Sequence, residues 1–489
     1  ATLPLSAVEA QARYRRLREL TSGCVERPAT PPRTASDRID AVLTHRLWGT
    51  LVFAGAMLLL FQSIFRWATP AMDAIDALFG VAGDALAAAL PEGALASLLV
   101  DGVVGGVGAV VIFLPQILLL FLFLGVLEDC GYMARAAFLM DRLMARVGLS
   151  GKSFIPMLSG FACAVPAVMA TRVIEDRRDR LATILVAPLM TCSARLPVYA
   201  ILIAGFIPDR ELLGGALDLK ALTLLGLYAL GIVAAMGCAL LFKRTLLRGP
   251  PPPFLLELPS YKWPAPGVLA ARLLDRAKAF LLRAGTIILA VSILVWAAAY
   301  FPRDEALAAR FAAERSAITV PEPAATPGDA EPAAAALLAA IDAREAAAHL
   351  EQSLLGRVGR SIEPLFTPLG WDWRITVSTL ASFPAREVIV ATLGTVFALG
   401  DGVDEESPDL RAALAAARRP DGTPLFTLPV ALSVMVFFAL CCQCAATVAT
   451  IRRETRSHGF AWFTFGYMTV LAWVSAAATF QLARWMSQA

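Results

Sequence analysis

The sequence predicts an all-α polytopic membrane protein with about eight transmembrane helices and two regions in which helices are broken or re-entrant. First, 58% of the 489 residues are hydrophobic, only 17% are charged, and the mean hydropathy is +0.65. Soluble chains carry about 45–50% apolar and about 25% charged residues. Second, uncharged runs of span length recur, and third, Gly and Pro interrupt some apolar segments. This pattern excludes an ordinary cytosolic enzyme, a disordered chain and a secreted module built on disulfides.

Span-length apolar segments account for most of the chain. A bilayer core needs about 20 apolar residues of helix. Uncharged runs that meet this length lie at residues 47–65, 103–127, 221–242, 284–301, 425–451 and 459–483. Two further segments of span length contain charged residues: residues 181–207 hold Arg195, and residues 375–400 hold Arg386 and Glu387. Together these segments give the predicted number of crossings.

A further apolar run, residues 153–170, is interrupted by Pro156, Gly160 and Pro166. Irregular backbone at membrane depth is tolerated only where it is buried in protein or lines a cavity. Pro166 lacks a backbone donor, which frees carbonyl groups around Ala162 and Cys163. A thiol beside free carbonyls offers a soft and a hard ligand together. The alternative is a kink for helix packing, with Cys163 as a small apolar filler.

Thiols recur at membrane depth in two other segments. Cys192 lies near Arg195, which could pair with a carboxylate, repel cations or snorkel, and we favour a structural pairing. Cys441, Cys442 and Cys444 lie in an uncharged run. Helical residues three apart share a face, so we expect Cys441 and Cys444 to point one way. Thiolates suit Cu(I), Zn and Fe rather than Mg or Ca, so these segments favour a soft-metal site.

Two carboxylates are further candidate ligands. Glu128 lies at the end of a predicted span, and Glu387 lies within one, beside Arg386. For Glu387, a salt bridge with Arg386 is the alternative to metal binding. No phosphate-binding loop is present at Gly151-Lys152-Ser153, because that motif requires a glycine where the chain has Arg146.

Basic loops predict the orientation. Residues 243–283 carry eight Lys or Arg against two acidic residues, and the first 46 residues are also rich in Arg. Cytoplasmic loops carry such an excess, so we expect both segments, and therefore the N-terminus, on the cytoplasmic side. Residues 302–360 are rich in Ala and are predicted to form an insert on the opposite side, helical or partly disordered. The net charge of +3 is too small to argue for nucleic-acid binding.

Several motifs resemble those of the ferrous iron transport protein B family, from about residue 35 to the end of the chain. The motifs stand at residues 128–138, 151–154, 160–167, 190–199, 383–388, 391–395, 443–444 and 452–455. The resemblance divides the chain into a cytosolic linker (1–46) and a membrane permease domain (47–489). Within the latter it implies a first gate (125–200), the insert (302–360) and a second gate (361–455).

The resemblance implies an importer of Fe(II) in the bacterial inner membrane, not an enzyme. It implies Cys163, Cys192 and Cys444 as metal ligands with freed backbone carbonyls, and Glu128 and Glu387 as further candidates. Family members carry an N-terminal GTP-binding domain, so GTP and Mg²⁺ would act only through that domain, and residues 1–34 are interpreted as the tail of the joining region. The implied partners are the lipid bilayer and small soluble proteins of the same uptake system; a homo-oligomer is allowed.

Three alternatives remain open at this point. Other divalent metals such as Mn, Co or Zn could be the transported ion. A gate-type nucleoside carrier has similar broken helices, although its substrates need polar and aromatic groups rather than thiols. A membrane enzyme that uses its thiols would need a nearby general base, and no predicted span contains a histidine.

Overall fold

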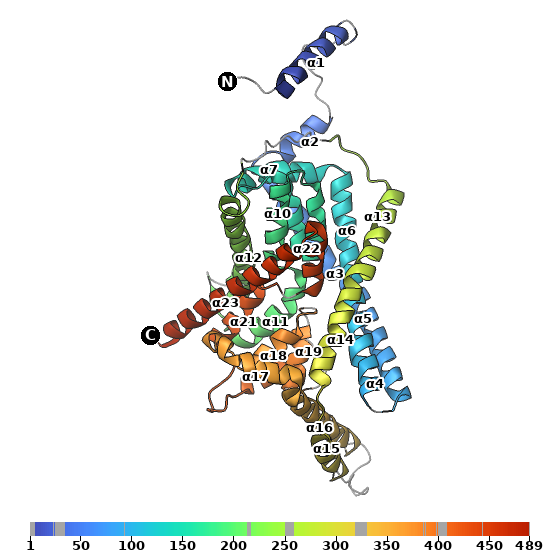
Figure 1. The fold of residues 1–489 in the computed structure, drawn as a ribbon, viewed down its shortest axis with the longest axis vertical. Coiled ribbons are helices and arrows are strands. Elements are labelled where there is room, and N and C mark those ends of the chain that lie inside the picture. The colour runs from blue at the N-terminus through green and yellow to red at the C-terminus, as the bar shows by residue number, and fades with distance from the viewer. Residues whose placement is uncertain are drawn as a thin grey trace.

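The computed structural model describes residues 5–22, 24, 35–91, 93–212, 217–249, 259–317, 330–384, 386, 388–397, 399, 408–442 and 444–488. These residues are nearly all helical (Figure 1). The exception is one antiparallel pair of two-residue strands, β1 (Glu211–Leu212) and β2 (Leu217–Asp218). The fold class predicted from composition and from uncharged runs of span length is therefore confirmed.

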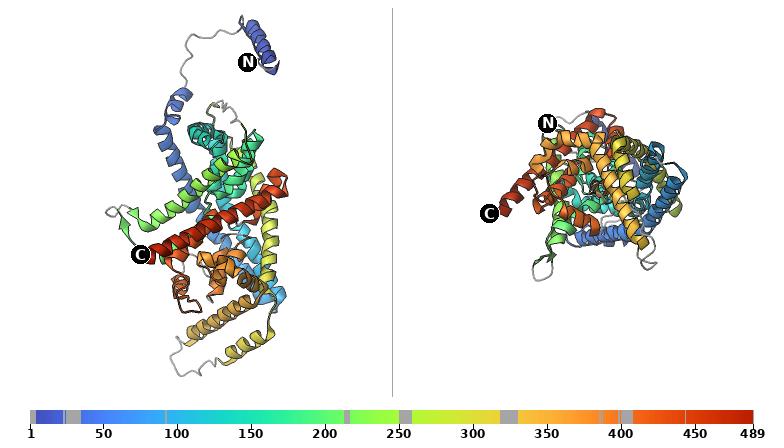
Figure 2. Two further views of the ribbon diagram at one scale, coloured as in Figure 1. Left: turned by 60° about the vertical axis from the view of Figure 1, so that its left-hand side comes forward. Right: turned by 90° about the horizontal axis from the view of Figure 1, so that it is seen from below.

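The N-terminal part begins with two helices at one end of the molecule, followed by a long helical hairpin (Figures 1 and 2). Its elements are α1 (Leu5–Thr21), α2 (Ala35–Leu43), α3 (Trp48–Ala89), α4 (Ala94–Ser97), η1 (Leu98–Val104), α5 (Gly105–Val111), α6 (Leu114–Asp129) and α7 (Tyr132–Arg146). The next part consists of short pieces: η2 (Gly151–Ser153), α8 (Phe154–Gly160), α9 (Ala164–Ala170), η3 (Thr171–Val173), α10 (Arg177–Val186), η4 (Ala187–Leu189), η5 (Ser193–Arg195) and α11 (Leu196–Phe206).

The second half continues with long helices, a helical insert and a second set of short pieces. Its first elements are α12 (Leu219–Arg244), α13 (Pro266–Phe280), η6 (Leu281–Gly285), α14 (Thr286–Tyr300), α15 (Glu305–Ala317), α16 (Ala330–Gln352), α17 (Leu354–Phe366) and η7 (Thr367–Leu369). They are followed by α18 (Trp373–Ala381), α19 (Val388–Val396), α20 (Pro408–Ala416), α21 (Leu428–Leu440), α22 (Ala445–Thr455) and α23 (His458–Gln488).

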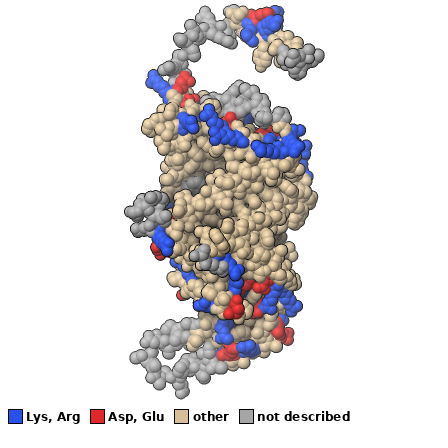
Figure 3. All heavy atoms as spheres, turned by 90° about the vertical axis from the view of Figure 1, so that its left-hand side faces the viewer, with Lys and Arg blue, Asp and Glu red and all other residues tan. Residues whose placement is uncertain are grey.

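Five stretches of the described helices are long and apolar enough to cross a membrane, or up to seven if two bent helix pairs each count as one span. Of the eight predicted spans, the one that these helices do not supply is residues 375–400, which contain the short helices α18 and α19, with nine residues each. Residues 153–170, predicted to be interrupted, form α8 and α9, with seven residues each. Figure 3 shows a broad belt nearly free of charged side chains between two charged ends.

Helix α21 is the centre of the largest core cluster. Ten of its 13 residues are buried, against α11, α12 and α23. On α23 the buried residues Ala472 and Ala476 present small side chains, which let helix backbones approach closely. Gly231 of α12 has the same effect at the end of η4, since a Cβ there would lie 2.9 Å from the carbonyl oxygen of Leu189. The short pieces are thus held in a tightly packed core.

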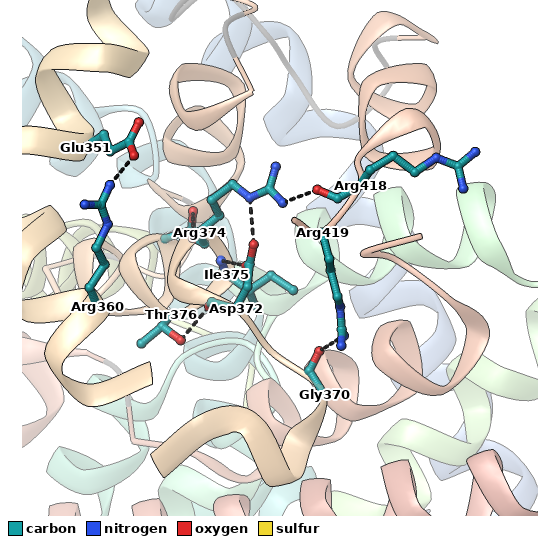
Figure 4. Close-up of polar contacts among 10 residues, drawn as sticks. Glu351, Arg360, Gly370, Asp372, Arg374, Ile375, Thr376, Arg418 and Arg419 are labelled. Atoms are coloured by element: carbon teal, nitrogen blue, oxygen red, sulfur yellow. Dashed lines mark hydrogen bonds and ion pairs between the residues drawn. The ribbon is translucent and has the colours of Figure 1, made fainter. Parts of the chain in front are cut away.

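A polar cluster fixes the start of α18 (Figure 4). Asp372 caps the helix by accepting from the backbone N–H of Ile375 at 3.1 Å, and it pairs with Arg374 at 2.6 Å. Arg374 also donates to the carbonyl of Arg418, and Arg419 donates to that of Gly370. A capped helix start tied to a neighbouring loop gives α18, and hence the second set of short helices, a defined position.

The predicted insert is helical where it is described. Helices α15 and α16 form a hairpin at the end of the molecule opposite α1 and α2 (Figures 1 and 2). Arg315 of α15 pairs with Asp342 at 2.7 Å and with Glu345, both on α16. Ion pairs therefore help to hold the two helices together.

Candidate functional site

Four breaks interrupt the apolar helices of the core. The first separates α8 from α9 at residues 161–163, as its glycine and proline residues predict, and the second lies at residues 190–192 between η4 and η5. The third lies between α18 and α19, and the fourth separates α21 from α22 at residues 441–444. The fourth break contradicts the expectation that Cys441 and Cys444 share a helix face, because α21 ends at Leu440.

Three of the predicted metal ligands occupy equivalent positions at these breaks. Each cysteine is the residue immediately before a helix: Cys163 before α9, Cys192 before η5 and Cys444 before α22. All three have extended backbone, with φ/ψ of −157°/139°, −85°/163° and −159°/108° respectively. The backbone therefore turns from one helical piece into the next at each thiol.

The breaks bring the three cysteines into one region. Cys163 and Cys444 pack against the same small cluster, which includes Val165 and Ala446, and α9 lies against α22. Ser193, next to Cys192, donates to the carbonyl of Ala162, next to Cys163, at 3.1 Å. Among the described residues, however, no three His, Cys, Asp or Glu side chains form a group that could hold a metal ion. The three breaks are neighbours, but their thiols do not form a closed site.

Two buried arginines meet at the end of α21. Arg195 donates to the carbonyl oxygens of Pro188 at 3.1 Å, Met190 at 3.0 Å and Cys441 at 3.4 Å. Arg386 donates to the same Cys441 oxygen at 3.0 Å. The last carbonyls of a helix have no partner within it and carry its partial negative charge. Helix ends therefore stabilise both guanidinium groups.

Hydrogen bonds connect the four breaks in sequence. Ser193 at the second break donates to the carbonyl of Ala162 at the first, at 3.1 Å. Cys441 links the second, third and fourth through Arg195 and Arg386. The N–H of Ala445 donates to the carbonyl of Phe383 at 3.2 Å, which closes the fourth break onto the third. Movement at one break must therefore change the contacts of the others.

The partners of Arg195 differ from one expectation. A carboxylate was one candidate partner for this intramembrane charge, but every acceptor that the structure gives Arg195 is a backbone carbonyl. These hydrogen bonds use carbonyl oxygens that have no partner within the interrupted helices. At the first break, Ser193 likewise occupies the carbonyl of Ala162, which Pro166 was predicted to release.

A cavity of about 700 Å³ is lined by residues of α6 and of the two helices at the first break. Its lining includes Ser159, Val165 and Pro166, on both sides of Cys163 in the sequence, together with Glu128. Its other charged lining residues are Arg172, Asp275, Arg276, Arg453 and Glu454. The predicted candidate Glu128 therefore lies in the same cavity as the residues that flank Cys163.

The other predicted metal ligands are two carboxylates, Glu128, which lines the cavity, and Glu387. Asp129, beside Glu128, pairs with Arg272 at 2.8 Å. Glu387 lies outside the described residues. The sequence did not single out Asp275 or Glu454 as cavity residues; the one available signal was that Glu454 belongs to a recognised motif at residues 452–455.

Comparison with known families identifies the chain. A model described as nucleoside recognition (Gate) matches residues 110–206 and 281–457, and one described as ferrous iron transport protein B C terminus matches residues 224–276. The chain belongs to the ferrous iron transport protein B family. The second match covers most of α12 and of α13, between the two parts of the Gate match.

Curated members of the ferrous iron transport protein B family match most of the chain. An Fe(2+) transporter FeoB of Leptospira interrogans is 41% identical over 95% of this chain and 62% of its own length. Its counterpart in Campylobacter jejuni is 35% identical over 92% of this chain and 66% of its own. A fusion of Fe(2+) transport protein A with FeoB from Porphyromonas gingivalis is 39% identical over 90% and 51%. The chain thus spans about 62% of the Leptospira relative, and no solved structure matches it.

Proposed function

We propose that the chain forms the membrane pathway of an Fe(II) importer in the bacterial inner membrane and is not an enzyme. The observation that carries this proposal is that three hydrogen-bonded helix breaks each start a new helical piece at a cysteine, and that the first of them borders a cavity that Glu128 also lines. The curated relatives are named Fe(2+) transporters. Fe(II) accepts thiolates, so this lining suits it better than it suits Mg²⁺ or Ca²⁺.

In the proposed pathway, carboxylates act first and thiols second. Glu128, Asp275 and Glu454 give the cavity negative charge that offsets its arginines. Fe(II) then loses water beside Cys163, Cys192 and Cys444, with Glu387 as a further candidate ligand. Arg195 and Arg386 occupy the carbonyls at residues 188–190 and 441, so these oxygens are not the ligands. Because the four breaks are hydrogen-bonded to one another, we infer that the two gates move together.

Orientation, coupling and partners extend the proposal. The basic loop and the N-terminus support a cytoplasmic position for α2 and an outward position for the α15–α16 hairpin. GTP and Mg²⁺ would act through a nucleotide-binding domain joined to the linker at residues 1–46. The Porphyromonas fusion supports a small soluble protein as a partner, and a homo-oligomer is compatible with the exposed apolar belt.

Anaerobic uptake of Fe(II) into proteoliposomes tests the pathway. Wild type is compared with Cys163→Ser, Cys192→Ser and Cys444→Ser, and with Cys238→Ser on α12 as the matched control away from the breaks. We expect loss of uptake in the first three at unchanged melting temperature and normal uptake in the control. Since a ligand thiol must lose its proton, uptake should also rise with pH. Normal uptake by Cys163→Ser would exclude this residue as a ligand.

Two other cargoes are distinguished in the same assay. Transport of a different divalent metal would be revealed by competition with Mn²⁺, Co²⁺ or Zn²⁺. The Gate description favours a nucleoside as the second candidate. Accumulation of radiolabelled nucleoside that survives all three cysteine substitutions, without iron uptake, would replace the iron proposal with that one.

A further inference from the structure

Five arginines surround a hollow of about 780 Å³ beside the cavity described above. The hollow lies between η3–α10 and the junction of α22 with α23. Its charged lining residues are Arg172, Arg177, Arg180, Arg453, Arg456 and Glu454. Guanidinium groups that share a small hollow repel one another, so an arrangement of five around one carboxylate is unfavourable unless an anion offsets them.

Glu454 fixes the orientation of two of the five. Its side chain is only 7% exposed and accepts from Nε of Arg172 at 3.0 Å and from Nη2 of Arg180 at 2.8 Å. The Nε–H of Arg180 is buried and has no acceptor within the described part of the chain. The carboxylate therefore holds these two guanidinium groups in place without satisfying all their donors.

The other three arginines have free donors. Arg177, Arg453 and Arg456 are exposed, and the structure gives their side chains no hydrogen bond or ion pair with any described residue. A guanidinium group presents a planar set of N–H donors that matches the oxygens of phosphate. Three guanidinium groups without partners and two held by Glu454 surround one hollow, and together they can bind a phosphate group.

The backbone adds a further positive element at the same place. Arg456 ends α22 in the left-handed region, with φ of 53°, and α23 begins two residues later with 31 residues in one helix. The first N–H groups of a helix have no partner within it and carry partial positive charge. Ser457 and Phe460 both line the hollow, so the start of α23 faces the same region as the arginines.

The apolar lining favours a particular carrier of the phosphate. Leu181, Ile184 and Phe460 complete the wall, and Trp462 on α23 is 63% exposed. Arg178, next to the hollow on α10, donates to the carbonyl of Arg248 in the basic loop at 2.6 Å. On the proposed orientation this end faces the cytoplasmic leaflet, where anionic lipids attract basic groups.

We propose that this arginine pocket binds a phosphate group, supplied by an anionic glycerophospholipid whose acyl chains lie along the apolar lining. The headgroup would contact Arg177, Arg453 and Arg456, while Glu454 keeps Arg172 and Arg180 in position. The proposal does not depend on the transported ion. A soluble phosphate is the other source of the same chemistry, and the experiment separates the two.

Lipid retention by the purified chain tests the proposal. The protein in detergent is given equal amounts of dioleoylphosphatidylglycerol and dioleoylphosphatidylcholine, and native mass spectrometry counts the retained lipids. In a second arm, inorganic phosphate is compared with chloride at equal ionic strength for its effect on melting temperature. The variant R177Q/R453Q/R456Q removes the three unpaired groups and no ion pair given by the structure.

The matched control is R142Q/R146Q/R244Q, which removes three exposed arginines from α7 and the end of α12, outside the hollow. We expect wild type and control to prefer phosphatidylglycerol and the pocket variant to bind it about 10-fold more weakly or worse. Stabilisation by inorganic phosphate without lipid preference, lost in the pocket variant only, would assign the site to a soluble phosphate. Equal losses in both variants, or no preference and no stabilisation in wild type, would overturn the site.

Discussion

Arg135 and Asp40 form a two-point ion pair that joins α7 to α2. Nε and Nη2 of Arg135 donate to the two carboxylate oxygens at 2.9 and 3.0 Å. The Arg135 side chain is 2% exposed, stacks over the ring of Tyr261 at 4.2 Å, and donates to the carbonyl of Pro259 at 2.6 Å. One buried side chain thus connects the N-terminal linker, the basic loop and α7, a helix within the predicted first gate.

Removal of this connection should loosen the linker from the gate. Arg135→Gln loses the two-point pair and leaves Asp40, whose side chain is 21% exposed, without its cation, at a cost of about 3 kcal/mol. We expect a lower melting temperature and faster hydrogen exchange in α2. Arg142→Gln on the same helix is the control, since Arg142 is exposed and the structure gives it no partner among the described residues. An unchanged exchange rate in α2 would mean that other contacts hold the linker.

Gly231 and Gly226 on α12 provide a test of the close packing at the second break. A Cβ at Gly231 would lie 2.9 Å from both the Leu189 carbonyl oxygen and Oγ1 of Thr191, whereas nothing lies within 4 Å of one at Gly226. Gly231→Ala should therefore destabilise the protein by about 1–3 kcal/mol. Gly226→Ala should be neutral or stabilising by up to about 1 kcal/mol, because alanine favours helix. Equal melting temperatures for both variants would contradict this packing.

The sequence predicted the first break but not the fourth. At residues 153–170, glycine and proline mark the interruption locally. Residues 425–451 contain no charge and no glycine, and their one proline, Pro429, lies in the first turn of α21, where proline is tolerated. The end of α21 coincides instead with bonds from Arg195 and Arg386 to the Cys441 carbonyl, across 246 and 55 residues of sequence. The residue pattern of one segment cannot predict hydrogen bonds from residues so distant in the sequence.

The sequence likewise predicted some of the residues of the candidate site but not their contacts. Thiol chemistry at membrane depth drew attention to Cys163, Cys192 and residues 441–444, and the family resemblance selected Cys444 from the last group. In the folded chain, Cys163, Cys192 and Cys444 each start a new helical piece at a break. Family motifs marked Glu454, but its two arginine partners come from residues about 280 positions earlier. Long-range polar pairing decides these contacts, and a single sequence gives no direct measure of it.

The α15–α16 hairpin should respond to mild acid through His349. Burial lowers the pKa of His349 below its ordinary 6.5, and Arg303 acts in the same direction against Glu345 and Asp304. The unfolded segment therefore takes up a proton at higher pH than the folded one. The hairpin should lose stability as pH falls below about 6.5, by up to about 1.4 kcal/mol per pH unit.

Hydrogen exchange in α15 and α16 at pH 7.5 and 5.5, corrected for the intrinsic rate, measures this effect. We expect faster local opening at pH 5.5 in wild type and a smaller change in His349→Gln. His458→Gln is the control because His458 is exposed at the start of α23. If His349→Gln keeps the full pH dependence, another group is responsible.

Arg195 offers the sharpest test of the linked breaks, because its bonds are directional. Arg195→Lys keeps the charge but cannot reach the carbonyls of Pro188, Met190 and Cys441 together. Each buried carbonyl left without a donor costs about 1–3 kcal/mol. If these bonds set the relative positions of the breaks, Arg195→Lys should transport poorly even where it folds, and Arg195→Leu should be less stable still. Uptake and melting temperature measured on the same preparations separate the two effects. Normal Fe(II) uptake by Arg195→Lys, at wild-type melting temperature, would mean that the breaks are positioned by packing and not by this guanidinium group.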